Sequence, residues 1–235
     1  MTQQLPPQTD ERRVITVLRD AEAARPEVRV EAWGELEVVV KDYTVRATTV
    51  KLLVGRYLVA REYAAHERLQ GLDGVPEAVA TRSPYVFAQI FVPGTPAPEV
   101  PELLTPEFFD QLRRLVQAIH RRAVAHADLK RLDNIIVQPD GRPALVDWSA
   151  AIISGSNPLA PMLLAYTQAD DLRAVAKLKQ RHAPHLLTEE DRKLLDQRTA
   201  VEQAWRWARS YLRPWLQKRA DPVTAGLRDA ARHHE

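Results

Sequence analysis

Cysteine is absent from this sequence of 235 residues, and several other residue types are scarce. Without cysteine the chain has no disulfide, no thiolate zinc site, no iron–sulfur cluster and no cysteine nucleophile. There are only eight glycines, and neither sign of charge dominates, because 33 Lys and Arg stand against 31 Asp and Glu. A formal net charge of +2 is too small to predict nucleic-acid binding, so no nucleic-acid partner is expected.

A long apolar run is also missing. Residues 1–13 are polar and contain prolines, unlike the apolar core of a secretory signal. The longest segment without charge, residues 148–169, contains Gly155, Pro158 and Pro161. We interpret it as a loop followed by the start of a buried helix rather than a transmembrane segment. These features predict a cytoplasmic protein.

The first part of the chain has the pattern of a small sheet followed by one helix. Stretches rich in β-branched residues predict three antiparallel strands, at residues 13–18, 27–32 and 36–42. Apolar residues at helical spacing then predict one long helix over residues 49–70, with a single face formed by Val50, Val54, Tyr57, Leu58, Ala65 and Leu69. Residues 84–92 predict a further strand pair, or a strand followed by a hinge.

The remainder of the chain is predicted to be mainly helical. The break Pro93-Gly94-Thr95-Pro96 suggests a lobe boundary close by. Thr105-Pro106 is a good helix start, and the helix is expected to end near Ala123. Short strands at 134–137 and 144–146 flank Asp140-Gly141, which predicts a tight hairpin. After residue 160 the chain is predicted to be helical throughout, with Thr188 and Asp191 as a capping box.

The candidate catalytic residues lie in the segment HADLKRLDNIIV (residues 126–137) and in ALVDWS (144–149), which follows it. Together the two segments resemble the catalytic loop and metal-binding Asp of protein-kinase-like proteins, in particular the atypical bacterial group related to the RIO and lipopolysaccharide-core kinases. The resemblance implies an α+β bilobal fold. Residues 1–91 would form a nucleotide-binding N-lobe with a small antiparallel sheet and one long helix, and residues 92–235 a mainly helical C-lobe that carries the site. It also implies ATP and Mg²⁺ as cofactors.

The resemblance assigns roles to individual residues of this loop. Asp128 would orient the attacking hydroxyl or accept its proton, and Lys130 would help to position the transferred phosphoryl group. Asn134 and Asp147 would hold the magnesium ion, for which oxygen ligands are suited. The usual pattern places the Asn five residues after the catalytic Asp, whereas Asn134 comes six residues after Asp128. The extra residue must bulge the loop, and Asp133 is the alternative ligand.

Upstream, VVVKDY (38–43) and AREYAAHERL (60–69) resemble the strand and helix that supply a phosphate-contacting Lys and its carboxylate partner. These residues are Lys41 and Glu62, and the resemblance adds Ile90 and Val92 to the nucleotide site. The sequence supports the pair independently, because Glu62 lies on the apolar stripe of its helix, where a lone carboxylate is costly. Glu67 lies off the stripe and should face water. An ion pair without any nucleotide would explain the same pattern.

Three departures from the family pattern keep other functions open. The connection RDAEAARPE (19–27) has no glycine, and its Asp20 and Glu22 would face phosphates unfavourably. Asp147-Trp148-Ser149 replaces Asp-Phe-Gly, and Ala160-Pro161-Met162 lacks the Glu of Ala-Pro-Glu. The favoured function is ATP- and Mg²⁺-dependent transfer to a hydroxyl, as in atypical Ser/Thr protein kinases. The alternatives are a lipopolysaccharide-core or sugar kinase, and a pseudokinase that acts as a binding module.

The segment 201–219 has the pattern of a basic amphipathic helix. Its aromatic and apolar residues gather near one face, and its arginines and lysine lie mostly elsewhere: Trp205, Tyr211, Leu212 and Trp215 against Arg206, Arg209, Arg213, Lys218 and Arg219. Such a helix fits peripheral contact with an anionic membrane. Packing of the tryptophans onto the larger lobe explains the same pattern and is the favoured interpretation.

Overall fold

The computed structural model of the chain describes residues 12–22, 25–45, 48–154 and 160–196. By its contacts the chain divides into two compact units, residues 1–194 and 195–235. Every residue of the candidate site lies in the first unit. The predicted helix at 201–219 falls outside the described residues.

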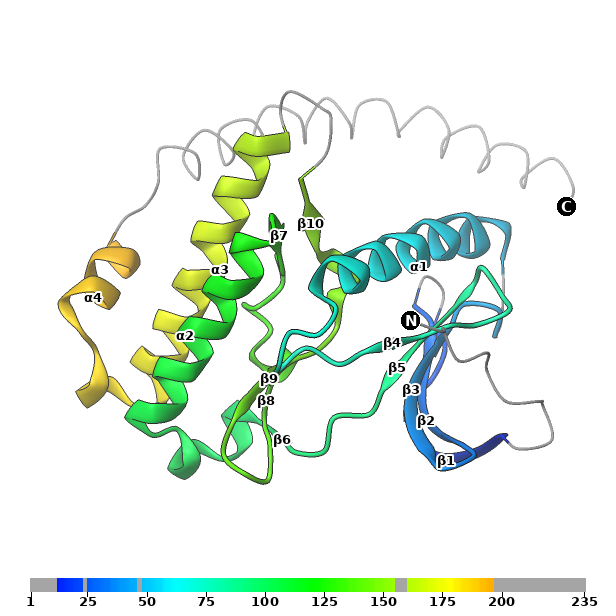
Figure 1. The fold of residues 1–235 in the computed structure, drawn as a ribbon, viewed down its shortest axis with the longest axis horizontal. Coiled ribbons are helices and arrows are strands. Elements are labelled where there is room, and N and C mark those ends of the chain that lie inside the picture. Colours follow the sequence, from blue (N-terminus) through cyan, green and yellow to red (C-terminus); the bar gives the residue numbers. More distant parts are fainter. Residues whose placement is uncertain (1–11, 23–24, 46–47, 155–159, 197–235) are drawn as a thin grey trace, which may run out of the picture. The chain divides into compact units, whose positions relative to one another are not determined.

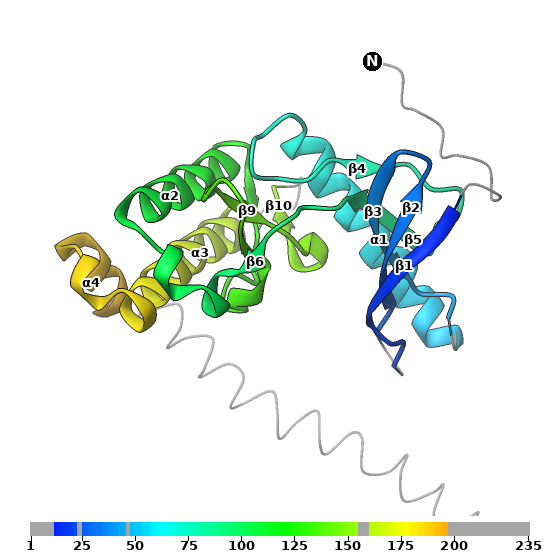
Figure 2. The ribbon, with the colours of Figure 1, turned by 90° about the horizontal axis from the view of Figure 1, so that it is seen from below.

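An antiparallel sheet of five strands forms the first part of the described chain, in the order β1-β2-β3-β5-β4 (Figures 1 and 2). Its strands are β1 (Arg12–Arg19), β2 (Glu27–Trp33), β3 (Leu36–Asp42), β4 (Ala78–Val79) and β5 (Val86–Ile90). The three strands predicted first are confirmed to within one residue at each end. Only two residues make up β4, too few for a periodic pattern, and it was not predicted. In this sheet β3 is central, because β2 and β5 pair with its two edges.

One long helix, α1 (Thr49–Leu69), packs against β4 and β5. The helix itself is confirmed, but the prediction that Val54 and Tyr57 lie on its buried face is wrong, because their side chains are 44% and 64% exposed. The buried stripe instead runs through Gly55, Val59, Glu62, Ala65, His66 and Leu69. Three of these are Gly, Glu and His, which a search for apolar residues passes over. Gly55 lies there because a Cβ at this position would come within 2.6 Å of the ring of Tyr43.

The second part is built on helices α2 (Pro106–Arg121), α3 (Ala160–His182) and α4 (Glu189–Asp196). α2 begins as predicted, because the Thr105 hydroxyl accepts a hydrogen bond from the backbone N–H of Phe108 at 3.2 Å and Pro106 occupies the first helical position. α2 and α3 pack side by side (Figure 1). Six apolar side chains of α2 are buried in the largest hydrophobic cluster: Phe108, Phe109, Leu112, Leu115, Val116 and Ile119. Each contributes about 1.5–3 kcal/mol to stability by leaving water.

After residue 160 the described chain is mainly helical, as predicted, but it is not helical throughout, because the helix breaks between α3 and α4. A short 3-10 helix, Pro184–Leu186, interrupts it, since Pro184 has no backbone N–H with which to continue α3. The predicted capping box is confirmed. The Thr188 hydroxyl accepts from the Asp191 N–H at 3.1 Å, and the Thr188 N–H donates to the Asp191 carboxylate at 3.0 Å.

Short strands lie between these helices and flank residues 126–134. β8 (Ile135–Val137) and β9 (Pro143–Leu145) form the predicted hairpin, whose turn places Gly141 at φ +80°. The others were not predicted, because two residues carry no periodic signal: β6 (Thr95–Pro96) pairs with β8, and β7 (Val124–Ala125) pairs with β10 (Ile152–Ile153). Further 3-10 helices span Ala97–Glu99, Pro101–Leu103, Leu132–Asn134 and Trp148–Ala150.

The fold class expected from the sequence is confirmed: an antiparallel sheet with one long helix precedes a mainly helical region. The division into lobes at residues 91 and 92 stays a prediction. None of the helices in the described part combines the length and apolar character needed to cross a bilayer.

Candidate active site

Lys41 lies near the end of β3, on the central strand of the sheet. Its backbone pairs with Val28 on one side and Phe87 on the other, which fixes its position. Its Nζ lies 2.6 Å from Glu62 Oε1 and 2.6 Å from Asp147 Oδ1. Burial by itself would lower the pKa of the Lys41 ammonium, but the Glu62 and Asp147 carboxylates outweigh it and raise this pKa above its ordinary value. Lys41 is therefore a fixed cation that holds two carboxylates.

Glu62 extends from the buried stripe of α1 and is 1% exposed. Burial raises its pKa, and the Lys41 ammonium and the backbone N–H of Trp148 act in the opposite direction by stabilising the carboxylate. A carboxylate in such a place is tolerated because it is paired and hydrogen-bonded. Glu67 is exposed, as expected for a residue off the stripe.

Asp147 follows β9 and adopts a left-handed backbone conformation, with φ 66° and ψ 71°. Few non-glycine residues adopt this conformation, and they often lie at functional sites. Burial would raise its pKa, but Lys41 and the Ser149 hydroxyl, which donates at 2.8 Å, hold it well below its usual range. Trp148 fills the position next to it, fully buried, and its indole N–H donates to the Leu145 carbonyl at 3.2 Å. Asp147 is thus an ionised carboxylate that is held in place by hydrogen bonds from Lys41 and Ser149.

Asp128 lies in the loop between β7 and β8, and its side chain is 19% exposed. Partial burial raises its pKa, against the attraction of nearby cations. The nearest is Lys130, whose Nζ is 3.9 Å from Asp128 Oδ1 and whose side chain is 69% exposed. The backbone carbonyl of Asp128 accepts from the Asn134 side chain at 3.1 Å and from the Arg131 N–H at 3.1 Å. Asp128 therefore presents a partly exposed carboxylate from a loop whose backbone is held by its own hydrogen bonds.

The extra residue of this loop is absorbed by the 3-10 helix Leu132–Asn134. Its turn leaves Asp133 exposed and turns Asn134 inward, at 7% exposure. The backbone carbonyl of Asn134 accepts from the N–H of Val146, the residue before Asp147, at 3.0 Å. Asn134 and Asp147 are therefore neighbours, and of the two candidate ligands Asn134 is the one next to Asp147.

Asp171 on α3 is a site residue that the sequence analysis missed. It is 2% exposed, and its carboxylate accepts from the backbone N–H of His126 at 2.7 Å and of Ala127 at 2.9 Å. His120 lies 3.2 Å from the same carboxylate, so it packs and bonds rather than facing the site. Ala127 has φ 64°, and Asp171 holds the loop in this unusual conformation just before Asp128. Its signal in the sequence is an Asp in register with buried Leu164, Val175 and Leu178 on one helix face.

A column of rings connects the loop to the sheet. The His126 ring lies 4.6 Å from the Trp148 ring, His66 lies 6.2 Å from Trp148, and Phe87 lies 5.1 Å from His66. Burial lowers the pKa of both histidines, that of His66 to about 4, so both are neutral at pH 7. The Nε2 of His126 contacts the Val146 carbonyl at 2.9 Å. Because Trp148 directly follows Asp147, this column of rings packs next to Asp147 in the chain.

The remaining predicted site residues are not joined to this cluster by the contacts of the described residues. Ile90 pairs with Val38 at the end of β5, and Val92 follows β5 outside any strand. Their assignment to the nucleotide stays a prediction. In the connection between β1 and β2, Asp20 and Glu22 are exposed, and Glu22 lies 3.8 Å from Arg25. That ion pair offsets part of the negative charge expected to repel phosphates.

Comparison with known proteins supports the fold and leaves the function open. A scan against protein-family models and a search of curated proteins both returned no match. Among solved structures the chain is similar to the Rio2 kinase–ADP/Mg²⁺–phosphoaspartate complex from Chaetomium thermophilum, with a TM-score of 0.55 and 17% identity. The match covers 80% of this chain and 63% of the Rio2 chain, which is less than two thirds of its length. The chain therefore has a protein-kinase-like fold. Because 1624 chains of solved structures match, the fold does not select one acceptor.

Proposed function

We propose that this protein is an ATP- and Mg²⁺-dependent phosphotransferase that transfers the γ-phosphate to a hydroxyl group. The observation that carries the proposal is the cluster of Lys41, Glu62 and Asp147, in which one buried ammonium lies 2.6 Å from each of two carboxylates. Phosphoryl transfer depends mainly on positioning and on electrostatic stabilisation, and it needs little covalent chemistry from the protein. A fixed cation beside a fixed, ionised carboxylate suits the phosphates and the metal ion of bound ATP.

The donor set fits magnesium. Mg²⁺ is bound in proteins by one or two side-chain oxygens together with substrate phosphates, and rarely by a complete cage of protein ligands. Asp147 offers an ionised carboxylate, and Asn134 keeps its amide oxygen for a cation because its amide nitrogen donates to Asp128. Within the described residues no group of three or more His, Asp or Glu suits a metal. When bound, the metal would neutralise charge on the phosphates, while Lys41 holds Asp147 and Glu62 in place.

Asp128 is the proposed base. Its carboxylate is partly exposed, its backbone carbonyl is bound by Asn134, and Lys130 lies close enough to help position the transferred group. Lys41 would contact the nucleotide phosphates and Glu62 would hold Lys41 in place, with Ile90 and Val92 completing the nucleotide site. In the Rio2 structure with the same fold, ADP, Mg²⁺ and a phosphoaspartate are bound together, which supports nucleotide chemistry in such a site.

We favour a protein Ser or Thr hydroxyl as the acceptor and keep a sugar hydroxyl as the alternative. Only residues 148–159 lie between Asp147 and α3, and they include β10, which pairs back onto β7. This leaves little chain for the peptide platform of ordinary protein kinases. A folded acceptor or the protein's own hydroxyls fit such a site better than an extended peptide. We place the activity in the cytoplasm, and we expect no nucleic-acid acceptor.

The test is nucleotide binding by the purified protein. We expect ATP with Mg²⁺ to raise the melting temperature clearly and ATP with EDTA to raise it much less, since ligand binding to the native state stabilises it. Asp147→Asn should abolish the difference between the two conditions. The matched control is Asp73→Asn, at an exposed carboxylate outside the cluster. Equal and negligible shifts with and without metal would replace the proposal with the pseudokinase function, which the glycine-free connection between β1 and β2 favours.

A further inference from the structure

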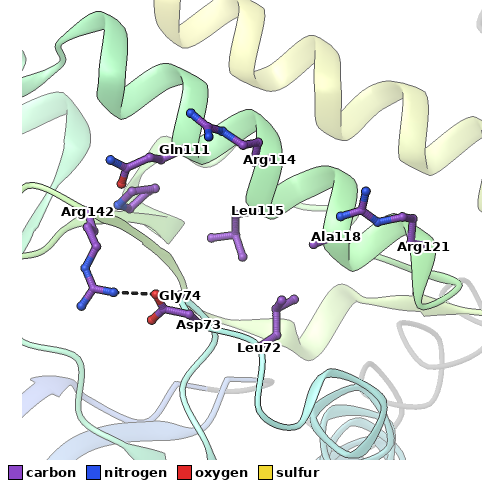
Figure 3. Close-up of a pocket in the computed structure, with 10 residues that line it drawn as sticks. Leu72, Asp73, Gly74, Gln111, Arg114, Leu115, Ala118, Arg121 and Arg142 are labelled. Carbon is purple, nitrogen blue, oxygen red and sulfur yellow. Dashed lines mark hydrogen bonds and ion pairs between the residues drawn. The ribbon is translucent and has the colours of Figure 1, made fainter.

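The outer face of α2 borders a hollow that the proposed function does not use. The hollow has a volume of about 430 Å³ and lies between the loop at residues 72–74, helix α2 and the start of β9 (Figure 3). Arg114 and Arg121 extend from α2, and Arg142, from the β8–β9 hairpin, lines the opposite side and points toward Asp73. We call this feature the arginine hollow.

The charges of the arginine hollow are only partly balanced. Arg142 is paired twice, with Nη1 2.5 Å from Asp73 Oδ2 and Nε 2.6 Å from Asp140 Oδ2. Among the described residues, Arg114 donates only to the backbone carbonyl of Asp110, at 3.2 Å. Both Arg114 and Arg121 are exposed, and neither has a carboxylate partner among the described residues. Two guanidinium groups on one side of the hollow are therefore available to an anion.

The floor of the arginine hollow is apolar. Leu72, Leu115 and Pro143 line it, and the Leu115 and Leu72 side chains extend toward one another between the arginines (Figure 3). The loop at 72–74 lies close against this floor, because a Cβ on Gly74 would be 2.7 Å from the Leu115 side chain. A ligand that fills the hollow must therefore combine negative charge at its ends with an apolar group in its middle.

The spacing of the two free arginines selects a chain rather than a small anion. Seven residues of α-helix separate Arg114 from Arg121, which is about 10.5 Å along the axis. A single inorganic anion contacts one of them at a time. An extended peptide advances about 3.3 Å per residue and places alternate side chains on one face, so acidic side chains four residues apart share a face over about 13 Å. An apolar side chain midway between them lies on the same face, and the long arginine side chains can reach outward to the two carboxylates.

We propose that the arginine hollow binds an acidic segment of a partner protein, with two carboxylates paired to Arg114 and Arg121 and an apolar side chain on the Leu72–Leu115 floor. Nucleic acid fits less well, because the apolar Leu72–Leu115 floor between the two arginines offers no partner to a continuous phosphate backbone. The hollow and the candidate active site share β9, which starts at Pro143 and ends just before Val146 and Asp147. Peptide binding stands independently of the proposed function, and only the use of this surface to dock an acceptor rests on it.

The experiment measures binding of a fluorescein-labelled peptide of about 12 residues, Glu-Ala-Leu-Ala-Glu flanked by Gly and Ser, to the full chain by fluorescence anisotropy. Arg114→Glu/Arg121→Glu should weaken binding by roughly tenfold or more, because charge-assisted Arg–carboxylate hydrogen bonds are lost. The matched control, Arg82→Glu/Lys177→Glu, makes the same change of charge at exposed residues outside the hollow and should leave the affinity within about twofold. A peptide with Gln in place of both Glu should bind as weakly as the double variant binds the acidic peptide.

A second double variant, Arg114→Gln/Arg121→Gln, removes the charge without reversing it, and its melting temperature shows whether the fold is kept. Equal peptide affinity in wild type and both hollow variants would overturn the proposal. Tighter binding of a single-stranded oligonucleotide, weakened by the same variants, would replace it with a nucleic-acid site. If the hollow variants lose affinity for the peptide while the wild type shows no metal-dependent nucleotide binding, the result would support the hollow and reject the proposed function. Metal-dependent nucleotide binding with no affinity for the peptide would do the reverse.

Discussion

Lys41 and Asp147 are 106 residues apart in the chain, yet Lys41 Nζ and Asp147 Oδ1 are 2.6 Å apart. The same ammonium also holds Glu62, so the strand β3, the helix α1 and the segment after β9 meet at one charge. A cation bound by Asp147 competes with Lys41 for that carboxylate. The position of α1 and the readiness of Asp147 to bind metal are therefore energetically linked through Lys41.

The first prediction tests this link with Lys41→Met, Glu62→Gln and the double variant. Lys41→Met leaves Glu62 buried without its cation and should lower the free energy of unfolding by about 3–5 kcal/mol. Glu62→Gln removes the charge that makes this loss so large, so the double variant should lose less than the sum of the two single variants. Denaturant unfolding measures all four proteins, and a coupling of at least about 1 kcal/mol is expected. Purely additive losses would leave Lys41 and Glu62 without a stabilising interaction.

Glu62 and Asp171 show how far the sequence predicts this site. Both are carboxylates on the apolar stripe of a helix, and both are almost fully buried. The partner of Glu62 is a side chain in a strongly patterned strand, so the pair is visible in the sequence. The partners of Asp171 are backbone N–H groups of His126 and Ala127, which point at it only because Ala127 has a left-handed backbone. Backbone geometry of this kind leaves no trace in residue types.

The second prediction separates Asn134 from Asp133. Asn134→Ala should remove the proposed metal ligand and the hydrogen bond to the Asp128 carbonyl, and so weaken metal-supported ATP binding and activity. Asp133→Ala should keep most of the ATP binding and the activity, because the Asp133 side chain is exposed to solvent. Magnesium titration of ATP binding for the two variants provides the measurement. The reverse ranking would make Asp133 the ligand.

The third prediction concerns pH and the buried ring of His66. Its folded-state pKa of about 4 lies below the ordinary value of 6.5, so the unfolded chain binds a proton over a range in which the folded protein does not. Stability from this residue is complete above about pH 6.5 and falls as the pH drops toward 4, by about 3 kcal/mol in all. His66→Phe keeps a ring between Phe87 and Trp148 but cannot titrate. Unfolding measured between pH 7 and pH 4 should show a shallower decline for this variant.

The control for this measurement is His185→Gln, at an exposed histidine in the 3-10 helix before α4, which should keep the decline of the wild type. Part of the slope will remain in His66→Phe, because burial also lowers the pKa of His126. A decline in His66→Phe as steep as that of the wild type would assign the pH dependence to other groups.

The arginine hollow and the short strands mark a second limit of sequence reasoning. Arg114 and Arg121 lie seven residues apart in a helix whose boundaries were predicted, so their shared face is readable from the sequence. The floor beneath them is not, because it is completed by the loop at 72–74, whose carbonyl at Gly74 accepts from the Leu145 N–H at 2.8 Å. That long-range contact depends on packing of β9 and not on any local pattern.

The final prediction is that Asp128→Asn separates binding from catalysis. Asn keeps the size of the side chain and leaves the backbone bonds to Arg131 and Asn134, so ATP affinity should stay nearly intact. It removes the proposed base, and general-base assistance accounts for roughly 10²- to 10⁴-fold in rate. With labelled ATP we expect autophosphorylation on Ser or Thr as the first activity of the wild type, poor transfer to a generic peptide, and a loss of this size in the variant. Equal labelling of wild type and Asp128→Asn would show that Asp128 is not the base, and modification of a sugar acceptor without any labelled protein would favour the sugar kinase alternative.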